Sequence, residues 1–253
     1  MSPFRRVSMP MHRYGEPEFD RHYVTWGLHD PDVQRREAES LLGLITPEGP
    51  VRILDLACGI GLHAIVWAKG GHGVTGVDLS ETFIAKANEY ARKEGVDASF
   101  IVSDIRDIEY ETEFDLVTWI ERSFFEPELA RAVWRFLRPG GSFIFDDRNP
   151  ENPKVKARQT DWRSWRETDG KFYLERHETN PETGYHEDAW ITIDPDAELI
   201  EEKVGDATIR QSLQERTEIL RQAGFREVQL RTIDGVPFTD GPEPSWLWVV
   251  AKK

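Results

Sequence analysis

Cysteine is nearly absent from this chain, because Cys58 is the only one among 253 residues. One cysteine cannot close an internal disulfide or build a cysteine-based metal site, which agrees with a reducing compartment. The chain also lacks a run of about 18 apolar residues, and residues 1–13 contain no apolar stretch of signal-peptide length. We therefore expect a cytoplasmic protein with no membrane partner.

Positive charge is also scarce. The 32 lysines and arginines are outnumbered by 46 acidic residues, which gives a formal net charge of −14. Such a field repels polyphosphates and argues against DNA or RNA as a partner. Internal repeats, low-complexity blocks and flexible linkers are missing as well, which favours one continuous fold with an elaboration. The expected partner is a small molecule, and self-association is left open.

Alternating helical and strand patterns occupy the first 150 residues. Asp30, Pro31 and Asp32 predict a helix start, because an acidic N-cap followed by proline suits the first turn. The apolar run 51–57 is typical of a strand buried on both faces. Further helices are predicted there at 61–69, 81–94 and 126–137, and further strands at 73–77, 99–102, 114–119 and 142–145. Near the C-terminus, a helix at 212–223 and strands at 225–232 and 246–251 are predicted as well. This alternation predicts an α/β fold with a parallel sheet covered on both sides.

The pattern changes after residue 170. Residues 171–179 and 185–194 flank a polar loop with a glycine late in it, which is typical of a longer hairpin. A third strand is predicted near 199–209. We therefore predict an antiparallel β insertion.

A glycine loop follows the first predicted strand. Residues 59–64 read G-x-G-x-x-A before a helix, and Asp78 lies 17 residues beyond Gly61. Glycines let a backbone turn sharply and approach a ligand, while an acid at the end of the second strand accepts hydrogen bonds from ribose. Dinucleotide sites and S-adenosylmethionine (SAM) sites share both features.

Asp55 separates these two alternatives. It lies four residues ahead of Gly59, where its carboxylate would repel a pyrophosphate and attract the ammonium of SAM. Asp104, beyond the third strand, offers an acceptor for an adenine amino group. Asp55, Asp78 and Asp104 together predict an acidic cleft suited to a cationic nucleoside.

Five segments resemble the motifs of class I SAM-dependent methyltransferases, in that family's order and spacing. They are VRILDLACGIG at 51–61, GVDLS at 76–80, SDI at 103–105, FDLV at 114–117 and LRPGG at 137–141. The resemblance implies a doubly wound α/β fold with a seven-stranded sheet of order 3-2-1-4-5-7-6 and an antiparallel strand 7. It implies SAM as cofactor, S-adenosylhomocysteine (SAH) as product and no metal. The implied SAM contacts are Asp55, Ala57, Gly59, Gly61, Asp78, Leu79, Asp104, Ile105, Trp119 and Ile120.

The C-terminal part is similar to small-molecule methyltransferases in which an antiparallel insertion after strand five covers the substrate. The expected organisation is an N-terminal lid and helix at 1–50, a SAM-binding core at 51–150, the insertion at 151–211, and a helix and hairpin at 212–253 that complete the core sheet. One departure is the segment 121–125, which is charged and then aromatic where the family has a longer, small-residue segment. The acceptor therefore cannot be inferred from the resemblance.

Acceptor-binding candidates follow strands four and five, because ligands of open α/β sheets bind at the carboxyl edge. They are Glu121 and Arg122 after strand four, and Asp146, Asp147 and Arg148 at the end of strand five. Asp147 is also a candidate proton acceptor. Asn149 and Asn152, each followed by proline, are interpreted as a loop beyond the sheet.

The predicted hairpin supplies three other candidate catalytic residues. His177 and His186 lie on opposite arms, where the loop brings the strands together, and Tyr173 lies near them. One of these side chains would accept a proton if the hairpin covers the active cleft. The alternative is a polar sheet face without catalytic function.

Three other positions have two interpretations each. By resemblance, the aromatic segment containing Tyr14 and Tyr23 folds over the cofactor as a lid, with Tyr23 against SAM and Tyr14 against the acceptor, and otherwise it packs on the first helix. Cys58 is interpreted as a small residue in a tight turn rather than a nucleophile. His63 either contacts the cofactor or caps the helix.

These observations favour SAM-dependent methyl transfer to a nitrogen or oxygen of a small molecule. The alternatives are a nicotinamide oxidoreductase, which Asp55 disfavours, a non-catalytic SAM-binding interaction protein, and non-methyl SAM chemistry in the same cleft.

Overall fold

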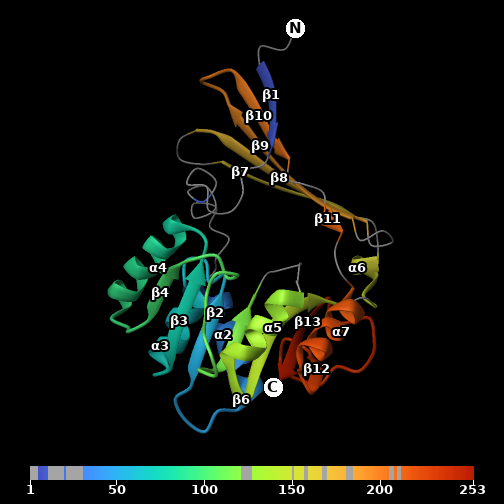
Figure 1. The fold of residues 1–253 in the computed structure, drawn as a ribbon. Helices are drawn as coiled ribbons and strands as arrows, with labels where there is room; N and C mark the ends of the chain where they lie inside the picture. The colour runs from blue at the N-terminus through green and yellow to red at the C-terminus, as the bar shows by residue number, and fades with distance from the viewer. Residues whose placement is uncertain are drawn as a thin grey trace. The chain divides into compact units, whose positions relative to one another are not determined.

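A computed structural model describes residues 5–10, 20, 31–120, 127–149, 151–156, 159–166, 170–180, 185–204, 208–209 and 212–253. The chain forms two compact units. The core unit contains Tyr14–Asn152 and Ser212–Lys253, and the second unit contains Met1–Arg13 and Pro153–Gln211. Both units are drawn in Figure 1.

The core unit is built on a seven-stranded sheet of order β4-β3-β2-β5-β6-β13-β12. Its strands are β2 (Arg52–Leu56), β3 (Gly73–Asp78), β4 (Ser99–Val102), β5 (Phe114–Trp119), β6 (Leu137–Arg148), β12 (Glu227–Arg231) and β13 (Trp246–Lys252). The strands from β4 to β6 run parallel, whereas β13 is antiparallel to both β6 and β12. In chain order this is 3-2-1-4-5-7-6, so the predicted topology is confirmed.

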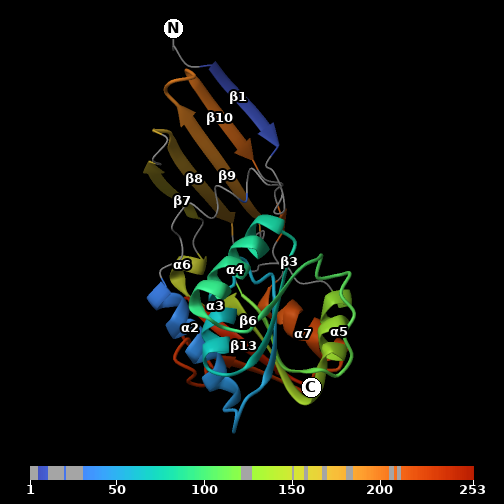
Figure 2. The same ribbon diagram turned by 90° about the vertical axis from the view of Figure 1, so that its left-hand side faces the viewer.

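Helices cover both faces of this sheet, as Figure 2 shows. They are α2 (Pro31–Ile45), α3 (Leu62–Lys69), α4 (Glu81–Glu94), α5 (Pro127–Phe136) and α7 (Leu213–Ala223). One hydrophobic cluster joins α2 and α3 to the sheet through Ile53, Leu116 and Ile144. A second cluster joins α5 and α7 to the other face, and it contains Leu54 and Val117. Successive residues of each strand thus point to opposite cores, which explains why these strands are apolar at nearly every position.

Local sequence signals set the ends of two helices. Ser80 caps α4 by accepting a hydrogen bond from the Phe83 amide at 3.0 Å, and Gly95 ends the helix in the left-handed conformation with φ 67°. Ser212 and Glu215 form a capping box at the start of α7. The predicted start and end of α4 are therefore confirmed, and α7 begins one residue after the predicted position.

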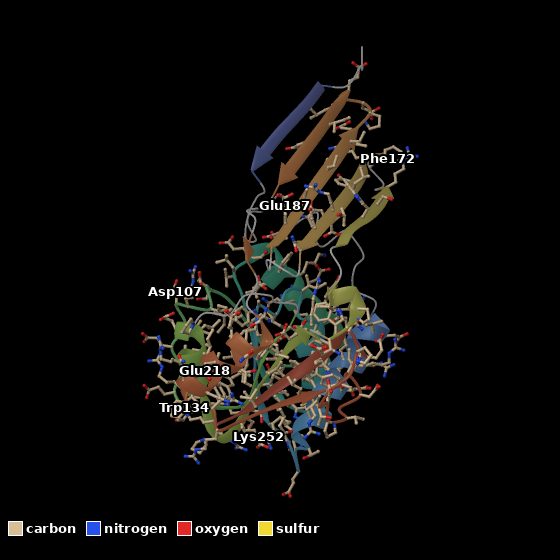
Figure 3. The ribbon with its side chains drawn as sticks, turned by 90° about the vertical axis from the view of Figure 1, so that its right-hand side faces the viewer. Asp107, Trp134, Phe172, Glu187, Glu218 and Lys252 are labelled. Atoms are coloured by element: carbon tan, nitrogen blue, oxygen red, sulfur yellow. The ribbon has the colours of Figure 1, made fainter. Side chains whose placement is uncertain are left out.

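The second unit contains a six-stranded sheet whose main order is β1-β10-β9-β8-β7, with β11 paired to β9. Its strands are β1 (Arg5–Pro10), β7 (Gln159–Arg166), β8 (Phe172–Asn180), β9 (Tyr185–Asp194), β10 (Leu199–Val204) and β11 (Thr208–Ile209), and the short helix α6 (Pro153–Lys156) precedes β7. The predicted hairpin is confirmed as β8 and β9. Figure 3 labels Phe172 on β8 and Glu187 on β9.

Two strands of this sheet were not predicted. The strand β7 lacks a clear apolar alternation, and β1 pairs in parallel with β10, with Arg5 opposite Leu199. Such a pairing joins distant parts of the chain, so no local sequence pattern predicts it. The sheet is therefore mixed rather than wholly antiparallel.

Candidate functional site

Asp55 lies at the carboxyl end of β2, at the centre of the core sheet. Its side chain is only 3% exposed, and the Thr118 hydroxyl on β5 donates a hydrogen bond to its Oδ1 at 2.7 Å. Burial raises the pKa of Asp55 to about 6, and Asp78 adds to this, whereas His63 and Thr118 act in the opposite direction. The neighbours of Asp55 do not offset the cost of burying its negative charge, so this carboxylate favours a positively charged ligand.

The loop from Ala57 to Gly61 is folded by left-handed backbone conformations and by Asp78. Ala57, Gly59 and Gly61 have φ values of 53°, 55° and 77°. The Asp78 carboxylate accepts hydrogen bonds from the amides of Gly59 at 2.8 Å and Ser80 at 3.0 Å. Asp78 therefore positions the glycine loop, in addition to the ribose contact that the resemblance implies.

The two loop glycines have different surroundings. A Cβ atom at Gly61 would lie 2.7 Å from Cε1 of Phe100 and 3.0 Å from the Ala87 Cβ, so this glycine allows close packing between helix and sheet. A Cβ atom at Gly59 would meet nothing within 4 Å. Gly59 is therefore the position where the loop backbone is open to a ligand.

This difference predicts opposite consequences for two alanine substitutions. We expect Gly61→Ala to lower the free energy of unfolding by about 3 kcal/mol, since it combines left-handed strain with a collision. Gly59→Ala should cost only the strain, about 1–2 kcal/mol, and act mainly on ligand affinity. Urea unfolding and SAH titration of both variants check this, and equal stability losses would contradict it.

Cys58 is a packing residue of this loop. A Cβ atom at Gly76 would lie 2.7 Å from the Cys58 sulfur, so the thiol fills the space beside β3. Burial raises the pKa of the Cys58 thiol well above its usual range. A thiol that stays protonated is a poor nucleophile, which supports the small-residue interpretation.

Asp104 lies beyond β4, the third parallel strand, and is engaged by Arg106. Its Oδ1 accepts hydrogen bonds from the Arg106 amide and Nε, both at 2.9 Å, and its Oδ2 accepts one from Nη2. The Arg106 guanidinium lowers the pKa of Asp104. Asp104 is thus kept ionised. Asp55 and Asp78 lie at the carboxyl ends of β2 and β3, and Asp104 follows β4. These three strands are adjacent and parallel, so their carboxyl ends share one edge of the sheet.

The other predicted cofactor residues of the core lie at the same edge. Leu79 is half exposed directly after Asp78, and Ile105 packs against the hydrophobic cluster on one face of the sheet. Trp119 ends β5, and Ile120 follows it. Four candidates, Tyr14, Tyr23, Glu121 and Arg122, lie outside the residues that the structure describes.

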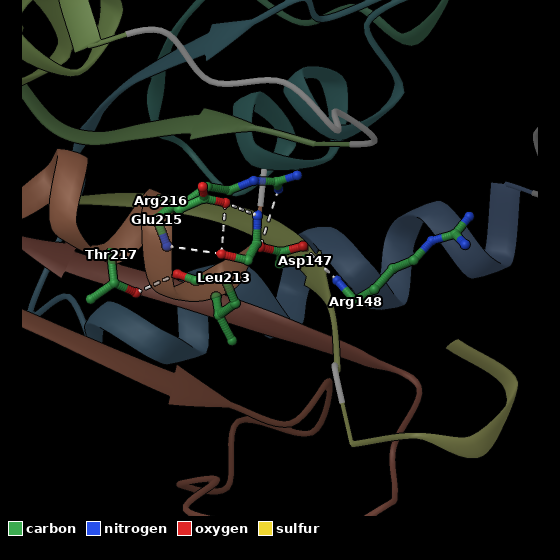
Figure 4. A network of polar contacts seen from close by, with 7 residues as sticks. Asp147, Arg148, Leu213, Glu215, Arg216 and Thr217 are labelled. Atoms are coloured by element: carbon green, nitrogen blue, oxygen red, sulfur yellow. Dashed lines mark hydrogen bonds and ion pairs between the residues drawn. The ribbon is translucent and has the colours of Figure 1, made fainter. Parts of the chain in front are cut away.

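Asp147 and Arg148 lie at the carboxyl end of β6 with different surroundings. Asp147 is buried on the α7 side, where its Oδ2 is 3.1 Å from Nη1 of Arg216 and its Oδ1 accepts the Arg148 amide at 2.7 Å (Figure 4). Arg148 places its guanidinium 5.3 Å from the ring centroid of Trp246, its neighbour on β13. The buried ion pair favours a structural role for Asp147, whereas Arg148 remains a candidate for binding the acceptor.

The two asparagines after β6 hold a distant loop. The side-chain amide of Asn149 donates hydrogen bonds to the carbonyls of Gly241 at 3.0 Å and Pro244 at 2.8 Å, and that of Asn152 donates to the Pro242 carbonyl at 2.6 Å. These bonds hold the segment that leads into β13.

The hairpin candidates lie in the second unit. Tyr173 is buried on β8. In the register of β8 and β9, His177 lies opposite Asp188 and His186 lies opposite Thr179. The two histidine positions are therefore diagonal neighbours rather than a direct pair. Their catalytic role stays a prediction.

Three residues that contact predicted residues of the core unit were not predicted themselves. They are Thr118, Arg216, and Glu37, whose Oε2 lies 3.3 Å from Nε2 of His63. Arg216 carried a usable signal, because it lies three residues after Leu213 and four before Leu220, in the apolar stripe of its helix. A cation at such a position indicates a buried partner. Metal-binding clusters of three or more His, Cys, Asp or Glu do not occur among the described residues. Within the same part of the chain, every helix is too short or too polar to cross a bilayer.

The sheet order, the glycine loop and the carboxylates at its edge define a class I SAM-dependent methyltransferase domain. Residues 53–141 match the family model of the methyltransferase domain.

Relatives agree with this assignment. An Alkalilimnicola ehrlichii ubiquinone biosynthesis O-methyltransferase is 38% identical over 135 residues, which are 50% of this chain and 52% of that protein. The chain spans about half the length of the curated relatives it matches. Two solved structures share the fold. A methyltransferase of Streptomyces caelestis has a TM-score of 0.71 at 18% identity, covering 92% of this chain and 95% of the other. A sugar N-methyltransferase of Streptoalloteichus has a TM-score of 0.69 at 20% identity, covering 98% and 96%.

Proposed function

We propose that this protein transfers the methyl group of SAM to a nitrogen or oxygen of a small-molecule acceptor. The observation that carries the proposal is the buried Asp55 carboxylate beside the open Gly59 backbone. The O-methyltransferase among the relatives and the sugar N-methyltransferase among the solved structures are consistent with either acceptor atom.

The residues present fit SAM better than a dinucleotide. Placing a pyrophosphate beside Asp55 would add negative charge to a carboxylate that burial already disfavours. The ammonium of SAM would instead neutralise it, and Asp78 and Asp104 supply acceptors for ribose and adenine. The acidic edge therefore disfavours the nicotinamide alternative.

SAM, when bound, supplies an electrophilic methyl group on a sulfonium. The protein has to align the acceptor in line with that group and keep water away. Asp55, the glycine loop and Asp78 would hold the cofactor. Arg148, Tyr14, Glu121 and Arg122 would orient the acceptor. Tyr173, His177 and His186 are the proton-acceptor candidates, because the ion pair with Arg216 favours a structural role for Asp147. The role predicted for residues 151–211, covering the acceptor, stays a prediction.

Ligand-induced stabilisation tests cofactor choice. We expect SAM and SAH to raise Tm and NAD to leave it unchanged, because a ligand that binds only the folded state stabilises it. Asp78→Ala should reduce the SAH-induced shift, since it removes the ribose acceptor and the hydrogen bond that orders Gly59. Stabilisation by NAD equal to that by SAH would reject the proposal, and an unchanged SAH affinity would remove Asp78 from the site.

A panel of amines, phenols and carboxylic acids tests the transfer itself. Mass spectrometry should find SAH together with an acceptor heavier by one methylene unit. SAM binding without any turnover across the panel would favour the non-catalytic alternative, and an acceptor that gains an aminocarboxypropyl group would establish the non-methyl chemistry.

A further inference from the structure

The two faces of the sheet in the second unit differ in exposure. Side chains alternate between the faces along each strand. On β8, Tyr173 and Glu175 point to one face and are each 4% exposed, whereas Phe172 points to the other face and is 41% exposed. Trp162 on β7 shares the face of Phe172, because it lies opposite Arg176, and it is 54% exposed. We call this second face the open face.

Apolar side chains form a continuous patch on the open face. In the register of the sheet, Phe172 lies opposite Ile193, which in turn lies opposite Ile200, and Leu174 lies opposite Ile191. With Trp162 on β7, the patch therefore crosses four neighbouring strands. Its aliphatic members are partly exposed and its two aromatic members are exposed. A patch of this kind on a protein surface typically marks a contact with another macromolecule.

The two ends of the open face carry opposite charge. At one end, the exposed Arg166 places its guanidinium 4.9 Å from the ring centroid of Phe172. At the other end, Glu178 and Glu187 lie opposite each other. Both carboxylates lie near one guanidinium, that of Arg176, at 3.8 Å and 2.6 Å, which leaves this group with a net negative charge. Figure 3 labels Phe172 near the basic end and Glu187 at the acidic end.

We infer that two copies of this chain associate through their open faces, packed face to face with the strands of the two copies running in opposite directions. A two-fold axis that relates the copies in this way stacks the two apolar patches. It also brings Arg166 of each copy toward Glu178 and Glu187 of the other. Parallel strands would instead place like charges together, so the charge distribution selects the antiparallel arrangement. The open face is thus complementary to itself.

The size of the open face fits a reversible dimer. Strands about 8 residues long, four abreast at about 4.8 Å spacing, present a flat area on the order of 500 Å². Two copies would then bury on the order of 1,000 Å², which lies at the lower end of specific interfaces. We therefore expect a dimer that dissociates on dilution. This inference concerns assembly and does not depend on the proposed function.

Sedimentation equilibrium of the full chain tests the dimer. At high micromolar concentration the wild type should approach twice the 29.3 kDa mass of one chain, and it should return to that mass on dilution. Ile191→Lys should raise the dimer dissociation constant at least about 100-fold, because it buries a charge at the centre of an apolar contact. Val236→Lys is the matched control, since it places the same charge at a 58% exposed apolar position of the core unit, and it should leave the dissociation constant unchanged.

Charge reversal tests the antiparallel arrangement. Arg166→Glu and Glu178→Lys should each weaken the dimer about 10-fold or more, because each brings like charges together across the interface. The double variant should recover most of the wild-type affinity. These variants also decide the inference if circular dichroism shows that Ile191→Lys does not fold, since Arg166 is exposed and Glu178 is partly exposed.

A wild-type chain that stays monomeric at high micromolar concentration would overturn the inference. The same holds if that monomer cosediments with phosphatidylglycerol vesicles, because the open face would then contact lipid instead of a second copy. A dimer that folded Ile191→Lys and both charge reversals leave intact would place the contact on another surface and reject the open face.

Discussion

Asp55→Asn is expected to stabilise the unliganded protein and to weaken SAH binding. The pKa of Asp55 rises from an ordinary 3.8 to about 6 in the folded protein, so ionising it there costs about 3 kcal/mol at neutral pH. Asparagine removes that cost and keeps an oxygen for the Thr118 hydroxyl. For a chain of this size we expect Tm to rise by roughly 5–10 °C. Loss of the charge-assisted contact should weaken SAH binding roughly 10- to 150-fold.

The sign of the pH dependence follows from the raised pKa. The folded state binds the Asp55 proton more tightly than the unfolded state, so the stabilisation of the variant is complete above pH 6 and fades as the pH falls toward 3.8. SAH affinity of the wild type should fall below pH 6, because the ligand must then displace that proton. Urea unfolding at several pH values and SAH calorimetry measure both effects.

Asp115→Asn supplies the control for a buried aspartate in the same sheet. Asp115 lies near the start of β5, accepts the Arg52 amide at 2.7 Å and pairs with Arg138. Its substitution should lower stability and leave SAH affinity unchanged. If Asp55→Asn also destabilised the protein at neutral pH, the description of Asp55 as a carboxylate held at an energetic cost for its ligand would be wrong.

Arg216→Met is expected to cause the largest loss of stability. Arg216 and Asp147 are both buried, and their ion pair joins α7 to the end of β6 (Figure 4). Removing the guanidinium leaves a buried carboxylate without that cation, a change that typically costs 3–5 kcal/mol. Urea unfolding should show a lower midpoint with an unchanged slope.

The double variant Asp147→Asn with Arg216→Met separates charge from packing. Neutralising both partners should recover most of the loss, because no uncompensated charge remains buried. Arg221→Met, at an exposed position of the same helix, should change stability by less than about 1 kcal/mol. A loss in the double variant equal to the sum of the two single losses would contradict a direct pairing.

The fold and the cofactor edge could be predicted because their signals are local or periodic. Buried parallel strands such as 51–57 are apolar on both faces, and the spacing of Asp55, Gly59, Gly61 and Asp78 is short enough to read directly. The sequence pattern does not predict which face of the sheet Asp147 points to, because both faces of β6 are buried. The strands β1 and β7 were missed since one pairs at long range and the other lacks periodicity.

The amino-acid sequence by itself determined the alternation of core helices and strands and the acidic glycine loop, because these features depend on neighbours in the chain. Its resemblance to class I SAM-dependent methyltransferases implied the order of the core strands and the cofactor. Only the tertiary structure decided that Asp147 is bound to Arg216, that Asp78 orders the loop and that Glu37 holds His63. Each of those contacts joins residues from different elements, and their charges acquire consequences only when burial removes water from around them.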